Sequence, residues 1–260
     1  MEFYRWHWLE ISPERLRDYD SLFQWRPQMA MLLDGFPIEE GQRLLDYGCG
    51  PGWTTLELAR RVGPSGRVIG CDLNRDFLSL AQQHAAELGL TERLEWLQAG
   101  DSSLPLADAS LDRIFCKNVL EYVPSLDDTL REFRRLLRPG GVARLIDSDW
   151  GLVVLEPLGP ERLERLLAHA RHAFKDGHAG RHLYGAARRA GFAQVKVRVI
   201  AYTDTEGQMR SVVRNLVDYA LAGGLPQAEA RRLLQEVDAA LERQEYLLAL
   251  PQFIVTATAP

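Results

Sequence analysis

A loop with glycine at every second position, preceded by a carboxylate, is the part of this sequence best suited to binding a charged ligand. It runs Asp46-Tyr47-Gly48-Cys49-Gly50-Pro51-Gly52, and it joins the apolar residues Leu44-Leu45 to a helix-like segment at 53–62. Glycines at such a turn permit positive φ angles and let the backbone approach a ligand closely. The following helix presents free N–H groups and its positive dipole end to an electron-rich ligand group. The pattern predicts a loop that binds a nucleotide-type cofactor.

The spacing of the glycines and the acid before them indicate which cofactor this is. A dinucleotide fingerprint reads G-x-G-x-x-G, with the third glycine packed beneath a pyrophosphate, whereas this loop reads Gly48-x-Gly50-x-Gly52. Asp46 would repel a pyrophosphate, but its carboxylate could pair with a cationic amino-acid group. S-adenosylmethionine (SAM), which carries an ammonium and a sulfonium, fits that requirement. The D-x-G-x-G-x-G pattern resembles the first motif of the class I SAM-dependent methyltransferases.

Two further acids follow the next two strand-like runs. Asp72 ends the run 67–71, and Asp101 ends the run 94–100. Ligands of open α/β sheets collect at the carboxyl ends of the strands, and a carboxylate there can accept hydrogen bonds from both ribose hydroxyls. Either acid alone could instead be a helix N-terminal carboxylate favoured by the dipole. Their shared place at the edge that carries the glycine loop favours ligand binding.

Later motifs extend the resemblance to the ubiquinone/menaquinone-biosynthesis type of small-molecule methyltransferase. Gly100-Asp101 is followed by Leu104-Pro105, the strand-like run 111–116 begins Leu-Asp, and 137–141 reads L-R-P-G-G. The resemblance covers 44–146 most strongly. It implies SAM as the cofactor, with Asp101 near the adenine amino group. It also implies that the Lys117-Asn118 pair lies at the methionine end, although smaller residues are more usual there.

The loop, the strand ends and the resemblance together define one set of expected cofactor-binding residues. They are Asp46, Gly48, Cys49, Gly50, Gly52, Asp72, Leu73, Asp101, Ser102, Lys117 and Asn118.

Strand-like and helix-like patterns alternate from 43 to 146, which predicts a doubly wound α/β fold with a mostly parallel sheet. We expect seven strands, the last two at 194–200 and 253–258; the resemblance implies that the final strand is antiparallel. The expected parts are an N-terminal helical cap, a SAM-binding core in two pieces, and a C-terminal helical insertion, at 1–40, 41–206 with 250–260, and 207–249. The insertion could be a lid, a dimer contact or simply packed core.

The composition of the chain indicates which kinds of partner are not expected. With 31 basic and 36 acidic residues the net charge is −5, so a polyanionic partner such as nucleic acid is not expected. Three cysteines without a C-x-x-C pair fit a reducing cytosol and predict no metal site. No apolar stretch approaches the length of a membrane-spanning helix. We expect a cytoplasmic protein with a small-molecule substrate, no membrane partner, and possible homodimers.

Methyl transfer from a sulfonium is an in-line displacement, for which alignment and exclusion of water supply most of the rate. A general base is needed only if the nucleophile arrives protonated. Asp147 continues the fifth strand-like run and is a candidate for that role, although it could instead cap a turn. His178 is a second candidate, although its segment more readily fits a structural role with Arg181 pairing to an acid after strand five.

Three aromatic residues are candidates for a lid over the cofactor or substrate. Tyr19, Trp25 and Trp150 could offer ring faces to a cation, while core packing explains them equally well. The function we expect is methyl transfer from SAM to an O, N or C nucleophile of a small metabolite. Two alternatives stay open: a methyltransferase-like cyclase that retains SAM without consuming it, and a non-catalytic SAM-binding regulator.

Overall fold

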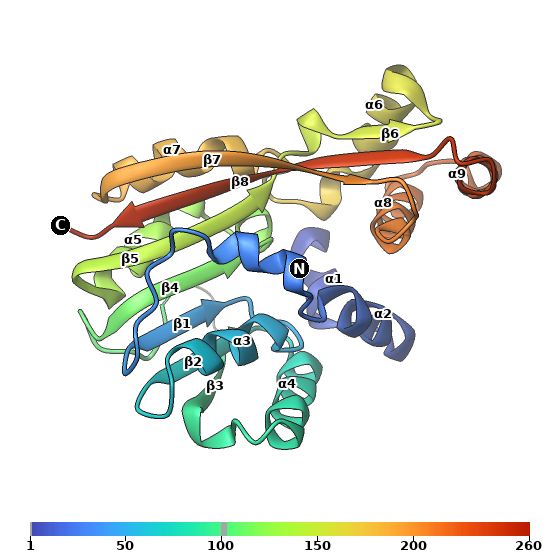
Figure 1. The fold of residues 1–260 in the computed structure, drawn as a ribbon. Coiled ribbons are helices and arrows are strands. Elements are labelled where there is room, and N and C mark those ends of the chain that lie inside the picture. Colours follow the sequence, from blue (N-terminus) through green and yellow to red (C-terminus); the bar gives the residue numbers. More distant parts are fainter. Residues whose placement is uncertain (1, 100–102) are drawn as a thin grey trace.

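One mixed β-sheet runs through the molecule. The computed structural model describes residues 2–99 and 103–260. Neighbouring strands follow the order β3-β2-β1-β4-β5-β8-β6, and β7 also pairs with β8 (Figure 1). The parallel strands are β1 (Arg43–Tyr47), β2 (Arg67–Asp72), β3 (Leu94–Gln98), β4 (Leu111–Lys117) and β5 (Leu137–Ser148). The remaining strands are β6 (Val154–Glu156), β7 (Ala193–Asp204) and β8 (Leu247–Thr258), and β8 runs antiparallel to its partners β5, β6 and β7. The expected doubly wound, mostly parallel α/β fold is confirmed.

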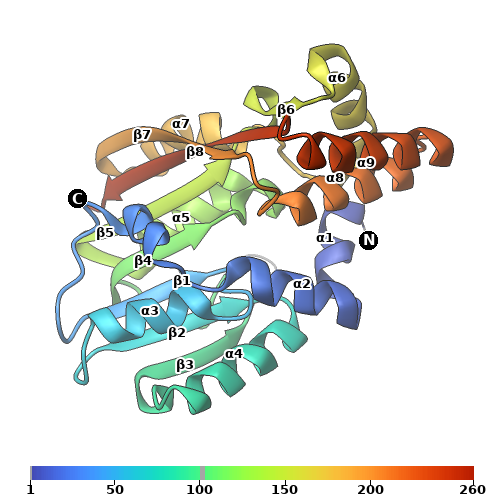
Figure 2. The ribbon, with the colours of Figure 1, turned by 45° about the vertical axis from the view of Figure 1, so that its right-hand side comes forward.

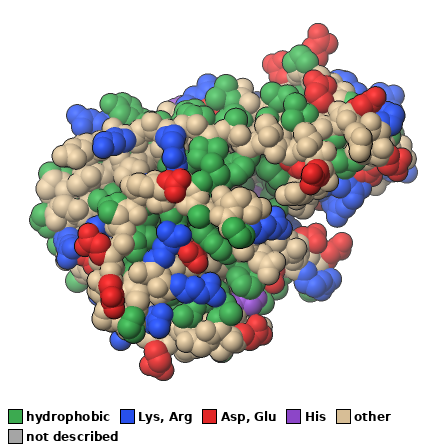
Figure 3. Space-filling view, in the orientation of Figure 1, with side chains coloured by type: hydrophobic (Ala, Val, Ile, Leu, Met, Phe, Trp, Pro, Cys, Tyr) green, Lys and Arg blue, Asp and Glu red, His purple; other side chains and the backbone are tan. Residues whose placement is uncertain are grey.

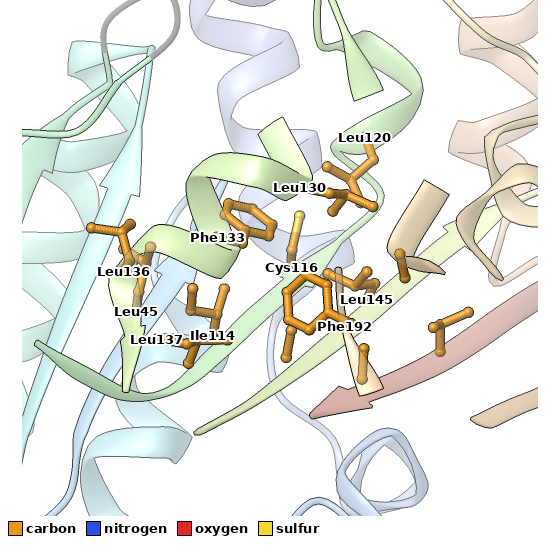
Figure 4. Packing of buried hydrophobic residues seen from close by; sticks show 14 of the residues in the cluster. Leu45, Ile114, Cys116, Leu120, Leu130, Phe133, Leu136, Leu137, Leu145 and Phe192 are labelled. Atoms are coloured by element: carbon orange, nitrogen blue, oxygen red, sulfur yellow. The ribbon is translucent and has the colours of Figure 1, made fainter. Parts of the chain in front are cut away.

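Alternation along the central strands places apolar side chains on both faces of the sheet. On one face, Leu45 and Ile114 pack against α5 (Leu126–Leu136) and α7 (Ala179–Arg189). Figure 4 shows Phe133 and Leu130 of α5 lying over the strands on this side. On the other face, the neighbouring residues of β1 and β4 pack against α3 (Trp53–Arg61). Helix α4 (Arg75–Glu87) packs beside β2 and β3. Helices on both faces hold the strand ends in fixed positions.

A second hydrophobic cluster lies beyond the far ends of β7 and β8. It joins α6 (Gly159–Ala170), α8 (Arg210–Ala222) and α9 (Gln227–Glu242). Figures 1 and 2 show these helices grouped at one end of the molecule, away from α3 and α4. The long strands β7 and β8 extend past the central sheet to carry them.

The N-terminal segment forms α1 (Phe3–Leu9), α2 (Pro13–Phe23) and the 3-10 helix η1 (Pro27–Leu33). Helix α2 begins at Pro13, and the Ser12 side chain accepts a hydrogen bond from the Arg15 N–H, a standard N-cap. The chain after η1 is tied to the sheet because the buried Arg144 guanidinium of β5 donates to the Leu32 and Asp34 carbonyls, at 2.6 and 3.0 Å. Helices α1 and α2 thereby lie near the ends to which β1 and β4 point (Figure 1).

Among the described residues, the sheet has eight strands, where seven were expected. The additional strand is the short β6, which pairs with residues 247–249 of β8. Strand β8 begins at Leu247, which lies inside the range 207–249 that was expected to be helical. Buried and partly buried side chains alternate from Leu247 onward, as in the expected strand 253–258, so the whole segment 247–258 is one strand. Strand β7 likewise extends to Asp204, past the expected end at 200.

Within 2–99 and 103–260, no helix combines the length and apolar character needed to cross a membrane. The same residues contain no cluster of three or more His, Cys, Asp or Glu side chains arranged to hold a metal ion.

Candidate active site

The glycine loop between β1 and α3 adopts a conformation that requires glycine at two positions for steric reasons. Gly48 and Gly52 have φ angles of 75° and 84°. A Cβ on Gly48 would lie 2.1 Å from a methyl of Val119, and one on Gly52 would lie 2.7 Å from the Ala81 Cβ. Gly50 also has positive φ, at 52°, but its only neighbour within 4 Å of such a Cβ is Phe23 at 3.9 Å. The loop is therefore closely packed on the protein side and open at Gly50.

Asp72, at the end of β2, fastens this loop to the start of α4. Its carboxylate accepts hydrogen bonds from the Gly50 N–H at 2.8 Å and from the Asn74 N–H at 2.9 Å. Burial raises the pKa of Asp72, and these N–H donors act in the opposite direction. Asn74 in turn caps α4 by accepting from the N–H groups of Asp76 and Phe77. Asp72 thus holds the loop in shape while lining the cavity beside it.

That cavity has a volume of about 120 Å³ and lies at the carboxyl ends of β1, β2 and β4. Its walls include Gly48, Gly50, Asp72, Leu73 and Lys117. A cavity at this edge, beside a glycine loop and the N-terminal end of a helix, suits an extended nucleoside-type ligand.

A smaller cavity of about 50 Å³ adjoins the same loop and is lined by Asp46, Cys49 and Trp53 among others. Asp46 is buried and accepts a hydrogen bond from the Thr55 hydroxyl at 2.6 Å. Burial raises the pKa of Asp46 to about 7. A buried carboxyl of this kind gains from a cationic partner, because an opposite charge compensates for its lost hydration.

A larger cavity, of about 440 Å³, lies between the carboxyl ends of the central strands and helices α1, α2 and α8. Near its opening, Figure 3 shows hydrophobic side chains gathered toward the middle of the drawn face, between η1 and strands β7 and β8. Five residues line both this cavity and the 120 Å³ cavity: Trp8, Phe23, Lys117, Asn118 and Tyr122. The two spaces therefore meet at these side chains.

Arg15 of α2 binds the N-terminal cap to α8 beside the larger cavity. Its guanidinium donates to the Tyr219 hydroxyl at 2.7 Å, to the Tyr19 hydroxyl at 3.2 Å and to the His7 carbonyl at 2.9 Å. It also lies 5.2 to 5.6 Å from the ring centres of Trp8, Tyr19 and Tyr219. These are cation–π distances. Arg15 thus joins the cap to α8, and we call this group of contacts the Arg15 latch.

Glu121 brings a buried carboxyl to the wall of the larger cavity. It lies on the 3-10 helix η3 (Leu120–Tyr122), is 3% exposed, and accepts a hydrogen bond from the Trp150 indole N–H at 2.8 Å. Burial and the neighbouring Asp147 carboxyl raise its pKa well above the usual value. Sequence analysis did not single out this residue. The available signal was a lone acid inside the otherwise apolar run 119–123.

The two candidate bases from the sequence lie elsewhere. Asp147 is 0% exposed, and its carboxylate accepts from the N–H groups of Ser148 at 2.9 Å, Leu120 at 2.8 Å and Glu121 at 3.3 Å. Burial raises its pKa to about 7. His178 places Nδ1 3.0 Å from a carboxylate oxygen of Asp149, and neither Asp147 nor His178 lines any of the three cavities described above. Asp147 shapes the turn that carries Glu121.

Other expected residues divide between the cavities and the core. Arg181 pairs with Asp149 after β5, as expected for a structural role. Tyr19 and Trp150 line the larger cavity, whereas Trp25 packs against the core cluster around η1. Asn118 has a φ of 54° and a buried side-chain oxygen that has no hydrogen-bond partner within residues 2–99 and 103–260.

Three more expected cofactor residues complete this comparison. Lys117 lines all three cavities, and burial lowers the pKa of its ammonium group. The expected sites Asp101 and Ser102 lie outside the described residues.

Comparison with known proteins identifies the class. Residues 44–141 match the family model for a methyltransferase domain. The chain is 32% identical over 243 residues to an uncharacterized 37.1 kDa protein in transposon TN4556 of Streptomyces fradiae, covering 90% of this chain and 67% of that one. It is also 32% identical over 126 residues to the ubiquinone/menaquinone biosynthesis C-methyltransferase UbiE of Klebsiella pneumoniae strain 342, covering 48% and 49%. The match spans about half the length of such curated methyltransferases.

Solved structures share the fold. A SAM-dependent methyltransferase from Aquifex aeolicus superposes with a TM-score of 0.58 at 18% identity, covering 96% of this chain and 100% of that one. Phosphoethanolamine N-methyltransferase 2 of Haemonchus contortus, in complex with SAM, gives a TM-score of 0.67 at 16% identity, covering 99% and 60%. The chain belongs to the class I SAM-dependent methyltransferases. Its cofactor is SAM.

Proposed function

We propose that this protein transfers the methyl group of SAM to a nucleophile of a small molecule held in the 440 Å³ cavity. One observation carries the proposal: the larger cavity and the loop-side cavity meet at Phe23, Lys117 and Asn118. A sulfonium at that junction would present its methyl group to a molecule in the larger cavity. In-line displacement needs this alignment and little else from the protein.

We place SAM along the glycine loop, across the two smaller cavities. Its ribose would lie beside Asp72 and Leu73, and its amino-acid end beside Gly48, Gly50 and Asp46. The Asp46 carboxyl supports this orientation of SAM, because the ammonium of its amino-acid end would compensate for the burial that raises the pKa of Asp46. Asp101 and Ser102 are proposed to contact the adenine on the strength of the family resemblance, and Cys49 and Gly52 to shape the loop.

A small-molecule substrate agrees with the shape and lining of the cavity. A volume of about 440 Å³ is within the usual range for small-ligand sites, and the walls are largely aromatic and aliphatic. The structural neighbours include geranyl diphosphate C-methyltransferase from Streptomyces coelicolor, with a TM-score of 0.59 at 16% identity. We further propose that the protein works in the cytoplasm, in keeping with its three unpaired cysteines.

A second candidate function has a specific observation behind it. The [4+2]-cyclase SpnF is among the structural neighbours, with a TM-score of 0.58 and 21% identity. A cyclase of this type would use the same enclosed cavity for a rearrangement and retain SAM.

Formation of S-adenosylhomocysteine distinguishes the two functions. Purified protein would be incubated with SAM and a panel of apolar metabolites, and S-adenosylhomocysteine would be quantified by mass spectrometry. Methyl transfer predicts one molecule of S-adenosylhomocysteine for each methylated product. A substrate that is rearranged while SAM stays intact would identify the cyclase instead.

A further inference from the structure

The larger cavity has two charged side chains at its inner end. Among described residues, five that line it are charged: Arg26, Lys117, Glu121, Asp204 and Glu206. Asp204 is engaged at the start of α8, where its carboxylate accepts from the N–H groups of residues 206, 208 and 209. Glu206 is exposed and Arg26 is partly exposed. Lys117 and Glu121 remain as the charged groups near the cofactor side.

Glu121 is held rigidly at this point. Its backbone N–H donates to Asp147, and its carbonyl accepts from the N–H groups of Lys175 at 2.9 Å and Asp176 at 3.1 Å. Its side chain is fixed by the Trp150 indole. Asn118 and Tyr122, on either side of it in the chain, line both the cofactor-side cavity and the larger one. The carboxyl therefore lies beside the junction at which methyl transfer is proposed.

Most of the remaining wall suits an apolar body with flat rings. Aromatic side chains line the cavity, together with leucine, methionine and valine residues and a minority of uncharged polar residues; the aromatic members include Trp8, Tyr19, Phe23, Tyr122, Trp150 and Tyr219. The aromatic part of the wall can hold a ring by stacking. The buried Asn118 oxygen, which has no hydrogen-bond partner among the described residues, adds an acceptor near the junction.

We propose that Glu121 is the general base of this site, and that its substrate is an apolar, ring-bearing phenol or alcohol methylated on oxygen. This inference rests on the proposed methyl transfer. The Glu121 carboxylate removes the hydroxyl proton as an oxygen lone pair forms the bond to the methyl carbon. The carbon–sulfur bond breaks and its electron pair stays on sulfur, giving neutral S-adenosylhomocysteine and a methyl ether. Glu121 then returns its proton to solvent.

Charges around Glu121 favour a neutral hydroxyl over an amine. Asp147 of β5 and Lys117 of β4 act on its carboxyl electrostatically, Tyr122 on its own turn acts by hydrogen bonding, and Tyr219 of α8 is also coupled to it. Burial and Asp147 raise the pKa of Glu121, which brings it toward the range useful for a base. An ammonium substrate would meet the Lys117 ammonium and the sulfonium at the same junction. A hydroxyl that loses its proton there is stabilised by both.

The test compares E121Q with the parent on matched probes. Glutamine keeps an oxygen that can accept from the Trp150 indole, so the fold is preserved while the base is removed. The hydroxyl probes are 2-naphthol, 4-phenylphenol and 2-phenylethanol, and the amine probe is 2-(aminomethyl)naphthalene. Products are identified by mass spectrometry and NMR, and SAM binding is measured by calorimetry. E87Q, at an exposed site on α4, is the matched control.

We expect methyl ethers from the hydroxyl probes and a kcat lowered about 100-fold or more in E121Q, which is the usual contribution of a general base. KM and SAM affinity stay within about threefold, and E87Q behaves like the parent. In the parent, kcat rises with pH through the raised pKa of Glu121, and this rise is absent from E121Q.

Four results would overturn the inference while leaving methyl transfer in place. They are unchanged kcat in E121Q, methylation on carbon, preference for the amine probe, and no turnover of any hydroxyl probe by SAM-bound protein. Failure of folded protein to bind SAM would instead remove the proposed function itself.

Discussion

Single residues decide how closely a cofactor can approach the loop between β1 and α3. Gly48 is restricted by both its φ of 75° and the Val119 methyl groups behind it. Asp72, at the end of the neighbouring strand β2, accepts a hydrogen bond from the Gly50 N–H. Gly48 therefore has no room for a side chain on the protein side, and the loop is fixed to the end of β2.

Gly48→Ala tests the packing of the loop. The left-handed backbone and the clash with Val119 each destabilise the variant, by about 3 kcal/mol together. Gly89→Ala is the matched control, because Gly89 has a φ of 65° and nothing within 4 Å of an added Cβ. The unfolding free energy of the Gly89→Ala variant should fall by about 1 kcal/mol. Urea denaturation measures both variants, and equal losses would refute the steric account.

Asp46→Asn tests the buried carboxyl. Since burial raises the Asp46 pKa from 3.8 to about 7, folded protein keeps a proton that unfolded chains release. The stability that folding gains from holding this proton is therefore fully present below about pH 4, and it is lost as the pH rises to about 7. Relative to D46N, the parent should lose up to about 1.4 kcal/mol of unfolding free energy per pH unit in that window. Urea denaturation at several pH values measures the unfolding free energy of both proteins. If the two free energies change with pH in parallel, the raised pKa of Asp46 is contradicted.

At the scale of elements, the roof of the larger cavity comes from two distant parts of the chain. Helix α2 and helix α8 meet through the Arg15 latch, in which Tyr19 also accepts a hydrogen bond from the Asn215 amide at 3.1 Å. Cap and insertion therefore line the cavity together and contact each other through these hydrogen bonds.

Arg15→Met should loosen this roof. Methionine fills part of the space but loses the donors and the cation, destabilising the contact by about 1 to 3 kcal/mol. Amide hydrogen exchange should become faster in α1, α2 and α8 and stay unchanged in β1 and β4. Arg17→Met, at an exposed site on the same helix, should alter none of these rates. Equal protection in R15M and the parent would show that the latch does not hold the roof.

Sequence patterns predicted the elements whose signal is local. The apolar runs of β1, β2 and β4 and the glycine loop required only neighbouring residues, and the confirmed order of elements followed from them. Leu247 and Leu248 were misassigned because two adjacent leucines fit the end of a helix as well as the start of a strand. The Arg15–Tyr219 contact joins residues far apart in the chain, which no local period can indicate.

The residues that line the cavities could be predicted only in part, for the same reason. Asp72 was predicted from its place at a strand end, where the topology brings polar groups together, and it lines the smaller cavity beside the loop. Glu121 was not predicted, because its place in the cavity wall depends on the shape of η3 and on Trp150, which follows the next strand. Asp147 was favoured at that edge, yet its oxygens are engaged by backbone N–H groups.

At the scale of the whole molecule, the central sheet and the separate helical cluster contribute different parts of the cavities. The sheet edge supplies the glycine loop, and the second cluster supplies α8 to the cavity roof. That cluster also contains α6, so 207–249 packs with residues that precede β7. The division into cap, core and insertion stays a prediction, and the proposed function depends on residues from all three lining the larger cavity.

Calorimetric titration with SAM, and separately with NADH, tests the central claim most directly. We predict a dissociation constant for SAM in the micromolar range and no binding of NADH. Asp72→Ala should weaken SAM binding by about 1.5 to 3 kcal/mol, through loss of a charged hydrogen-bond acceptor. Folded protein, free of carried-over ligand, that binds NADH or fails to bind SAM would contradict the account.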